Sequence, residues 1–193
     1  MTKYFAPAAF AAASLFVAGP ALAQASTDPT SVQAGTYALE TSHARVVFSV
    51  SHMGFSTWYG DFSGATGSLT IDPKNVAAAK LDVSIPVASV TTTNAKLDGE
   101  LKSAAWFDAE KFPTITFKST SVAQTSPNTA KVTGDLTFHG VTKPVTLDVS
   151  FKASGVNPLS KAFTIGFDAK GALKRSDYGV KTYVPLIGDD VDL

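Results

Sequence analysis

The sequence contains no cysteine, and this single absence excludes several kinds of chemistry. None of its 193 residues can form a disulfide, bind a metal as a thiolate or act as a thiol nucleophile. The folded chain must therefore take its stability from an apolar core or from a bound ligand. Thirteen phenylalanines indicate that this core is large.

Motifs for catalysis and metal binding are also missing. The three histidines (His43, His52 and His139) stand at no spacing typical of metal ligands, and the sequence has no HExxH, GxSxG, Walker or GxGxxG motif. Its 16 basic and 16 acidic residues cancel, which argues against sequence-independent binding of nucleic acid. We therefore expect no enzyme, no metal, no cofactor and no nucleic-acid partner.

The one long apolar run lies at the N-terminus. Lys3 precedes an apolar stretch over residues 5–18, and Ala21-Leu22-Ala23 fits the small-x-small pattern of a signal-peptidase site. The run is shorter than the ~20 residues that a bilayer core requires. We therefore expect residues 1–23 to be a signal peptide cleaved after Ala23, leaving an exported protein without a membrane span. Residues 24–35 are small, polar and aperiodic, which predicts a flexible linker.

Alternation of apolar and polar residues dominates the rest of the chain. It predicts strands, each with one apolar and one wet face, around Val46–Val50, Leu81–Ile85, Ile115–Phe117, Leu147–Phe151 and Phe163–Phe167. This pattern is typical of an all-β, antiparallel fold. Roughly eight such strands predict two packed sheets or one closed barrel, whose interior is filled by side chains or holds a small ligand. One helix is expected from Ala95 to Ala105, with Asn94 as its N-cap.

Three polar segments stand beside glycines near predicted strand ends. They are Ser51-His52-Met53-Gly54, Phe138-His139-Gly140-Val141-Thr142-Lys143 and Arg175-Ser176-Asp177-Tyr178-Gly179. One interpretation is turn chemistry, in which glycine supplies positive φ and Ser or Asp bonds to nearby backbone. The other gathers His52, His139, Lys143 and Arg175 at one end of an apolar interior, where they would contact the head group of an amphiphile. The residues alone leave both interpretations open.

These segments, in this order, resemble the YceI family of periplasmic proteins. The resemblance runs from about Tyr37 to Val191 and includes Ser42-His43-Ala44, Gly60-Asp61-Phe62-Ser63-Gly64, Trp106-Phe107-Asp108 and Phe112-Pro113-Thr114-Ile115-Thr116-Phe117 besides the three polar segments. It implies an extended, eight-stranded, lipocalin-like antiparallel barrel over residues 36–193. It also implies a periplasmic carrier that holds an isoprenoid-type lipid (polyprenyl phosphate or isoprenoid quinone) or a related long-chain amphiphile.

On this interpretation, the apolar strand faces line the lumen or core of the barrel. The residues expected there are Phe48, Val50, Phe62, Leu69, Ile85, Phe117, Leu136, Phe138, Val149, Phe151, Ile165 and Phe167. Two rival functions stay open. One is a secreted structural or stress-related interaction protein whose barrel is filled and holds no ligand. The other is a lipid-modifying enzyme with His52 or His139 as base, which requires a carboxylate or Ser within hydrogen-bond reach. The sequence also leaves a homodimer open.

Two departures from the family pattern bear on the ligand and the barrel. Where members carry an Arg-Asp pair and a His, this chain has Leu97-Asp98-Gly99-Glu100. The loss of a cation and an imidazole favours a neutral head group, such as a quinone or amide, if this helix caps the lumen. The chain also stops at Leu193, where members continue through a full last strand. We therefore expect a short closing strand and a weaker seam.

Overall fold

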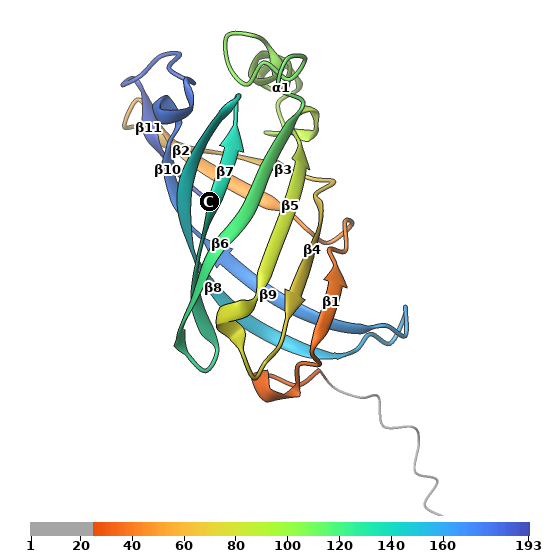
Figure 1. The fold of residues 1–193 in the computed structure, drawn as a ribbon. Coiled ribbons are helices and arrows are strands. Elements are labelled where there is room, and N and C mark those ends of the chain that lie inside the picture. Colours follow the sequence, from red (N-terminus) through yellow and green to blue (C-terminus); the bar gives the residue numbers. More distant parts are fainter. Residues whose placement is uncertain (1–24) are drawn as a thin grey trace, which may run out of the picture.

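The computed structural model describes residues 25–193, in which antiparallel strands curl around one apolar core (Figure 1). A seven-stranded sheet has the order β1 (Gly35–Ala38), β4 (Thr66–Ile71), β5 (Lys80–Pro86), β6 (Thr114–Ser126), β7 (Thr129–Phe138), β8 (Val141–Val156) and β9 (Phe163–Lys170). A four-stranded sheet has the order β10 (Ala172–Lys174), β11 (Ile187–Asp192), β2 (Val46–His52) and β3 (Ser56–Phe62). The predicted all-β, antiparallel, lipocalin-like fold is confirmed.

Residues 25–193 form eleven strands, where the sequence indicated roughly eight. The difference arises because short strands such as β1 and β10 have too few residues to show alternation. The predicted signal peptide, residues 1–23, lies outside the described residues. Within the part of the chain that the structure describes, no helix is long and apolar enough to cross a membrane.

Alternation along the strands builds the core. On β7 the residues Val132, Leu136 and Phe138 are each 8 % exposed, whereas Lys131 and Asp135, each of which directly precedes one of them, face solvent. Burying a side chain of this size contributes about 1.5–3 kcal/mol.

Gly134, on the inner face of β7, makes room for an aromatic ring from β6. A Cβ at this position would lie 2.5 Å from Cζ of Phe117. The ring of Phe117 can therefore approach β7 closely, and it is 6 % exposed.

The helix α1 (Ala95–Lys102) lies over one end of the sheets (Figure 1). Asn94 is its N-cap, as predicted: the side chain accepts hydrogen bonds from the backbone N–H groups of Lys96 and Leu97. The helix ends three residues before the expected Ala105, because the backbone turns extended at Ser103. Leu101 enters the core here, and Trp106 and Phe107 follow it, so this end of the barrel is filled by side chains.

Part of the expected linker, residues 26–32, lies against the barrel. Asp28 caps the short 3₁₀ helix η1 (Pro29–Ser31) by accepting a hydrogen bond from the N–H of Thr30. The backbones of Ser26 and Ser154 exchange two hydrogen bonds, at 2.8 and 2.9 Å. Val32 is 7 % exposed. We call residues 26–32 the N-terminal strap.

A bulge in β8 creates the attachment point for this strap. The pairing of β8 with β9 shifts register between Phe151 and Ala153, which leaves Lys152 as an extra residue. Such a bulge reverses which side chains face inward. Ser154 therefore points into the interior, where it is 2 % exposed and its hydroxyl lies 2.6 Å from that of Ser31.

The closing strand is short, as expected, but it is paired on both sides. β11 has six residues and pairs with β10 on one edge and with β2 on the other. Beyond the strand, Leu193 and Gly171 exchange two backbone hydrogen bonds at 2.8 and 3.1 Å. The pairing of β11 with β2 covers three residue pairs and shifts register between Ile187 and Val191, and among the described residues no strand pairs one sheet with the other.

Candidate binding pocket

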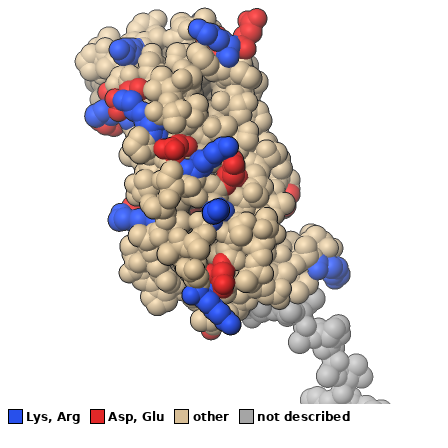
Figure 2. All heavy atoms as spheres, viewed as in Figure 1, with Lys and Arg blue, Asp and Glu red and all other residues tan. Residues whose placement is uncertain are grey.

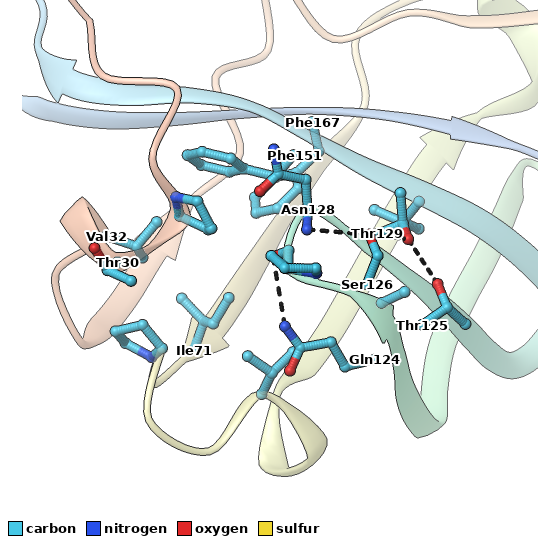
Figure 3. A pocket seen from close by; sticks show the side chains of 16 residues that line it. Thr30, Val32, Ile71, Gln124, Thr125, Ser126, Asn128, Thr129, Phe151 and Phe167 are labelled. Carbon is cyan, nitrogen blue, oxygen red and sulfur yellow. Dashed lines mark hydrogen bonds between the residues drawn. The ribbon is translucent and has the colours of Figure 1, made fainter.

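A pocket of about 520 Å³ is shown from close by in Figure 3. The segments that line it lie at the end of the barrel opposite α1 (Figure 1). The pocket lies between the N-terminal strap, the turn after β4, the β6–β7 hairpin and the inner face of β8 and β9. Its lining residues are Pro29, Thr30, Val32, Ile71, Pro73, Val76, Gln124, Thr125, Ser126, Pro127, Asn128, Thr129, Ala130, Val149, Phe151 and Phe167. The volume falls within the range typical of small-molecule sites, about 300–1,000 Å³.

The floor of the pocket is apolar. Phe151 and Phe167 form an edge-to-face pair with ring centroids 5.7 Å apart, and Val149 lies on the same face of β8. Phe167 is 37 % exposed, so an aromatic surface faces the open pocket. Figure 3 shows Thr30 and Val32 of the strap across the pocket from Ser126 and the hairpin. A ligand here would cover apolar area that the protein itself leaves wet.

The rim is polar and carries no charge. The hydroxyl of Thr129 lies 2.7 Å from the hydroxyls of both Thr125 and Ser126. Gln124 donates from Nε2 to the carbonyl of Pro127 at 3.4 Å. None of the lining residues is Lys, Arg, Asp or Glu. The rim therefore offers hydroxyls and carboxamides, which donate and accept hydrogen bonds without a formal charge.

Charged side chains on the strands behind the pocket point away from it. Lys131 pairs with Asp148 at 2.6 Å and Lys152 with Asp168 at 3.0 Å. Lys131 alternates with Ala130 and Val132, and Asp148 with Leu147 and Val149, so these two side chains face outward. Lys152 and Asp168 are exposed. Figure 2 shows basic and acidic side chains interspersed on the face drawn there, without a large patch of one sign.

The structure brings three of the four predicted head-group residues together at the other end of the barrel. They surround the 3₁₀ helix η4 (Arg175–Tyr178): His139 Nδ1 lies 2.9 Å from the carbonyl oxygen of Tyr178, and Lys143 pairs with Asp177 at 2.9 Å. His139 follows the last residue of the ten-residue strand β7, whereas Thr129 at its first residue lines the pocket. At ~3.3 Å per residue, about 30 Å separate the two ends.

Arg175 is buried and its donors are used inside the protein. It is 5 % exposed and its guanidinium lies 5.4 Å from the ring centroid of Trp106. Four backbone carbonyls accept hydrogen bonds from it at 2.8–3.1 Å: those of Val180, Thr182, Ile187 and Gly188. Burial lowers the pKa of this guanidinium, and the nearby Asp189 raises it. Four of its five N–H groups thus hold the 180–188 loop in place.

His139 and Gly140 form the two-residue turn between β7 and β8. Their φ angles are 49° and 75°, and Phe138 pairs directly with Val141. A two-residue hairpin turn of this kind needs positive φ at both positions. A Cβ on Gly140 would lie 2.5 Å from the ring of Phe112, so glycine is required here for space as well. His139 and Gly140 thus have the role in a turn that was one of the two interpretations of this segment.

His52 lies at the end of β2, with its ring 5.2 Å from that of Trp58. Among the described residues, the hydrogen-bond partner of His139 is a backbone carbonyl, and neither His52 nor His139 hydrogen-bonds to a carboxylate or Ser. The hypothesis of a lipid-modifying enzyme requires such a partner for its catalytic base, so these contacts do not support it. The head-group roles of His52, His139, Lys143 and Arg175 stay predictions.

The predicted lumen residues divide into three groups. The buried core contains Phe62, Ile85, Phe117, Leu136 and Phe138. The pocket is lined by Val149, Phe151 and Phe167. The remaining four are partly buried: Phe48, Val50, Leu69 and Ile165. The apolar interior is thus filled toward α1 and open toward the β6–β7 hairpin.

Sequence reasoning missed the strap and the hairpin as walls of the pocket. Two signals were available: Asp28-Pro29, a typical start of a short helix, and the turn at Ser126-Pro127-Asn128. Neither signal shows which end of a barrel is open, because that depends on side chains from several segments that are far apart in the sequence.

A second, shallower hollow of about 400 Å³ lies beside the β2–β3 hairpin. Its lining residues are Ser51, Met53, Gly54, Phe55, Pro185 and Leu186. Phe55 is 92 % exposed and does not contact the first pocket, which makes it a useful control position.

Comparison with known proteins agrees with this architecture. Residues 37–193 match the model of the YceI-like domain. Protein YceI of Escherichia coli O17:K52:H18 is 41 % identical over 154 residues, which cover 80 % of this chain and 80 % of that protein. The crystal structure of a Campylobacter jejuni YCEI protein has a TM-score of 0.66 at 32 % identity, covering 81 % of this chain and 92 % of that one. A polyisoprenoid-binding domain from Saccharophagus degradans, at 14 % identity, shares the fold with a TM-score of 0.56 and covers 83 % of this chain and 94 % of its own.

Proposed function

The chain belongs to the YceI-like family, and on that premise we propose that it is a periplasmic binding protein for an isoprenoid-type lipid. The observation that carries the proposal is the open, apolar-floored pocket of about 520 Å³ at one end of the barrel. The proposal is further supported by a shared fold with a domain that binds polyisoprenoids. The predicted signal peptide supports export to an aqueous compartment, where such a lipid needs a carrier.

The hydrophobic effect would supply the binding free energy. Each buried methylene contributes ~0.8 kcal/mol, so a five-carbon prenyl unit contributes roughly 4 kcal/mol before association costs. Several units must therefore be buried for tight binding. The apolar floor of Val149, Phe151 and Phe167 offers surface for this.

The rival function, a filled barrel without a ligand, has one observation in its favour. Toward α1 the interior is packed with aromatic side chains, among them Phe62, Phe107 and Phe138, whose neighbouring rings lie 5.3–6.0 Å apart. A protein of that kind gains no stability from lipid. A binding protein gains RT ln(1 + [L]/Kd), so its melting temperature rises with lipid concentration.

Native mass spectrometry of the full chain, expressed in a Gram-negative host and purified from the periplasm, tests the proposal. We expect a co-purifying prenyl lipid, and re-uptake of one by the delipidated protein with a rise in melting temperature. Phe167→Asp should abolish uptake by placing a charge on the pocket floor. Phe55→Asp, at the exposed hairpin position, should leave uptake unchanged. Purified protein that carries and takes up no prenyl lipid would refute the proposal and favour the filled-barrel alternative.

A further inference from the structure

We infer that the pocket selects a lipid with an uncharged, hydrogen-bonding head group and discriminates against a phosphorylated one. The inference rests on the proposed function and adds two points to it: the chemical class of the head group and the end of the barrel at which it binds. The head group lies at the hydroxyl and carboxamide rim formed by the β6–β7 hairpin, about 30 Å from the cationic residues around η4.

The chemistry of the rim suits a carbonyl, a hydroxyl or an amide. The hydroxyl of Thr129 lies 2.7 Å from those of Thr125 and Ser126, and all three can rotate to donate or accept. Within the described residues, no hydrogen bond uses the side-chain carboxamide of Asn128, and Gln124 uses only its Nε2. The rim thus has donors and acceptors to offer a neutral polar group.

A phosphate would meet no cation on the pocket wall. Phosphate recognition uses Arg, Lys or a run of backbone N–H groups, and the lining contains no Arg or Lys. Lys131 and Lys152 are paired with carboxylates on the outer face. A phosphate dianion at this rim would lose part of its solvation without gaining a partner charge.

The charges that border the pocket oppose an anion further. Asp28 precedes the lining residue Pro29, and Asp72 stands between the lining residues Ile71 and Pro73. Lys74 is the one basic residue in the turn after β4, and it shares that turn with Asp72, which accepts a hydrogen bond from its backbone N–H at 2.9 Å. Around these two turns, carboxylates outnumber cations.

The direction of the bound lipid follows from the same arrangement. The polar rim residues Thr125, Ser126 and Asn128 are exposed, whereas Val149 and Phe151 lie deeper on the barrel's inner face. The prenyl chain therefore points inward along the apolar floor, and the head group stays at the mouth, where water still reaches it.

A set of three lipids with the same prenyl chain tests the inference: a polyprenol, the corresponding polyprenyl phosphate and a prenylated quinone. In competition measured by native mass spectrometry, we expect both neutral lipids to bind the full chain at least tenfold more tightly than the phosphate. Equal or tighter binding of the phosphate overturns the inference and leaves the proposed function standing. Binding of none of the three overturns both.

Charge-insertion variants locate the head group. Asn128→Lys places a cation at the rim, and we expect it to reduce the preference for neutral lipids at least threefold. Thr125→Lys is a second variant of the same kind, should the first fold poorly. Lys143→Ala, at the opposite end, should leave the preference unchanged. A preference that responds to Lys143→Ala and not to either rim variant overturns the assignment of the head group to this end.

Discussion

The hydroxyls of Ser31 and Ser154 lie 2.6 Å apart and join the N-terminal strap to the strand behind the pocket. Ser154 is 2 % exposed, because the bulge in β8 turns it inward. Together with the two backbone hydrogen bonds of Ser26, this contact holds one wall of the pocket in place. Since the strap precedes the first strand, this wall can move without unpairing either sheet.

A disulfide between positions 31 and 154 should therefore lock the pocket. The chain has no other cysteine, so Ser31→Cys combined with Ser154→Cys can form only this bond within one molecule. It would close a loop of 123 residues, which in the chain-entropy model stabilises the fold by up to about 4–5 kcal/mol. We expect the oxidised protein to release bound prenyl lipid at least tenfold more slowly than the reduced protein.

Each single-cysteine variant serves as control, because it removes the same hydroxyl without forming the bond. Lipid dissociation from these variants should be insensitive to oxidant. An oxidised double variant that exchanges lipid as fast as its reduced form would show that the ligand passes between other elements of the barrel.

Two phenylalanines from different parts of the interior should separate stability from binding. Phe117 is 6 % exposed in the filled core, so Phe117→Ala should cost about 3–5 kcal/mol of unfolding free energy. Phe167 is 37 % exposed on the pocket floor, so Phe167→Ala should cost less than about 2 kcal/mol while weakening lipid binding about tenfold. Urea denaturation and lipid titration measure the two effects. Equal loss of stability in both variants would contradict the division of the interior into core and pocket.

Much of this fold could be predicted from period-two alternation. Val46, Phe48 and Val50 share the inner side of β2, and Leu147, Val149 and Phe151 share that of β8, as their spacing indicated. The N-cap Asn94 was recognisable because its side chain acts on neighbours two and three residues away. Strand alternation and helix capping depend on residues only a few positions apart, so short stretches of sequence are enough to predict them.

The pocket could not be located in the same way. Its walls come from residues as far apart as Thr30 and Phe167, and whether the interior is open or filled depends on how side chains from many strands meet. Arg175 illustrates the limit: a cation near glycines suggested a ligand contact, but its carbonyl partners belong to a loop that lies beside it only after folding. The inward turn of Ser154 likewise depends on a bulge that alternation alone does not reveal.

Substitution of Arg175 should unfold the end of the barrel near η4. Arg175→Met keeps the length of the side chain but leaves four carbonyl acceptors without their donor, and we expect a loss of roughly 3–5 kcal/mol. Arg175→Lys should restore little, because one ammonium group cannot reach carbonyls on several sides. Thermal denaturation measures the loss.

The neighbouring Lys174→Ala is the matched control, since this side chain is exposed and forms an ion pair with Asp190 at 2.7 Å. Its effect should stay below about 1 kcal/mol. If Arg175→Met were as stable as the wild-type protein and lost lipid binding instead, Arg175 would be a head-group ligand, as the sequence first suggested.

Acid should loosen the N-terminal strap through Asp28. Hydrogen bonds from the backbone N–H and the hydroxyl of Thr30 hold the pKa of this carboxyl below its ordinary value of 3.8. Because the folded-state pKa is depressed, the cap stabilises the strap above the unfolded pKa and is lost as the pH falls through the folded one. The strap should therefore be unaffected between pH 5 and pH 8 and should weaken only below about pH 4.

The amide resonance of Thr30 reports this titration directly, since the N–H of Thr30 donates a hydrogen bond to Asp28 Oδ1, with an N···O distance of 2.9 Å. We expect its chemical shift to move with a midpoint below pH 3.8, together with faster release of bound lipid. Asp28→Asn is the decisive control, because Asn caps a helix about as well as Asp but does not ionise in this range. That variant should keep the strap ordered and show no acid midpoint at Thr30. If the Asn variant showed the same midpoint, the acid response would come from another carboxylate and not from the Asp28 cap.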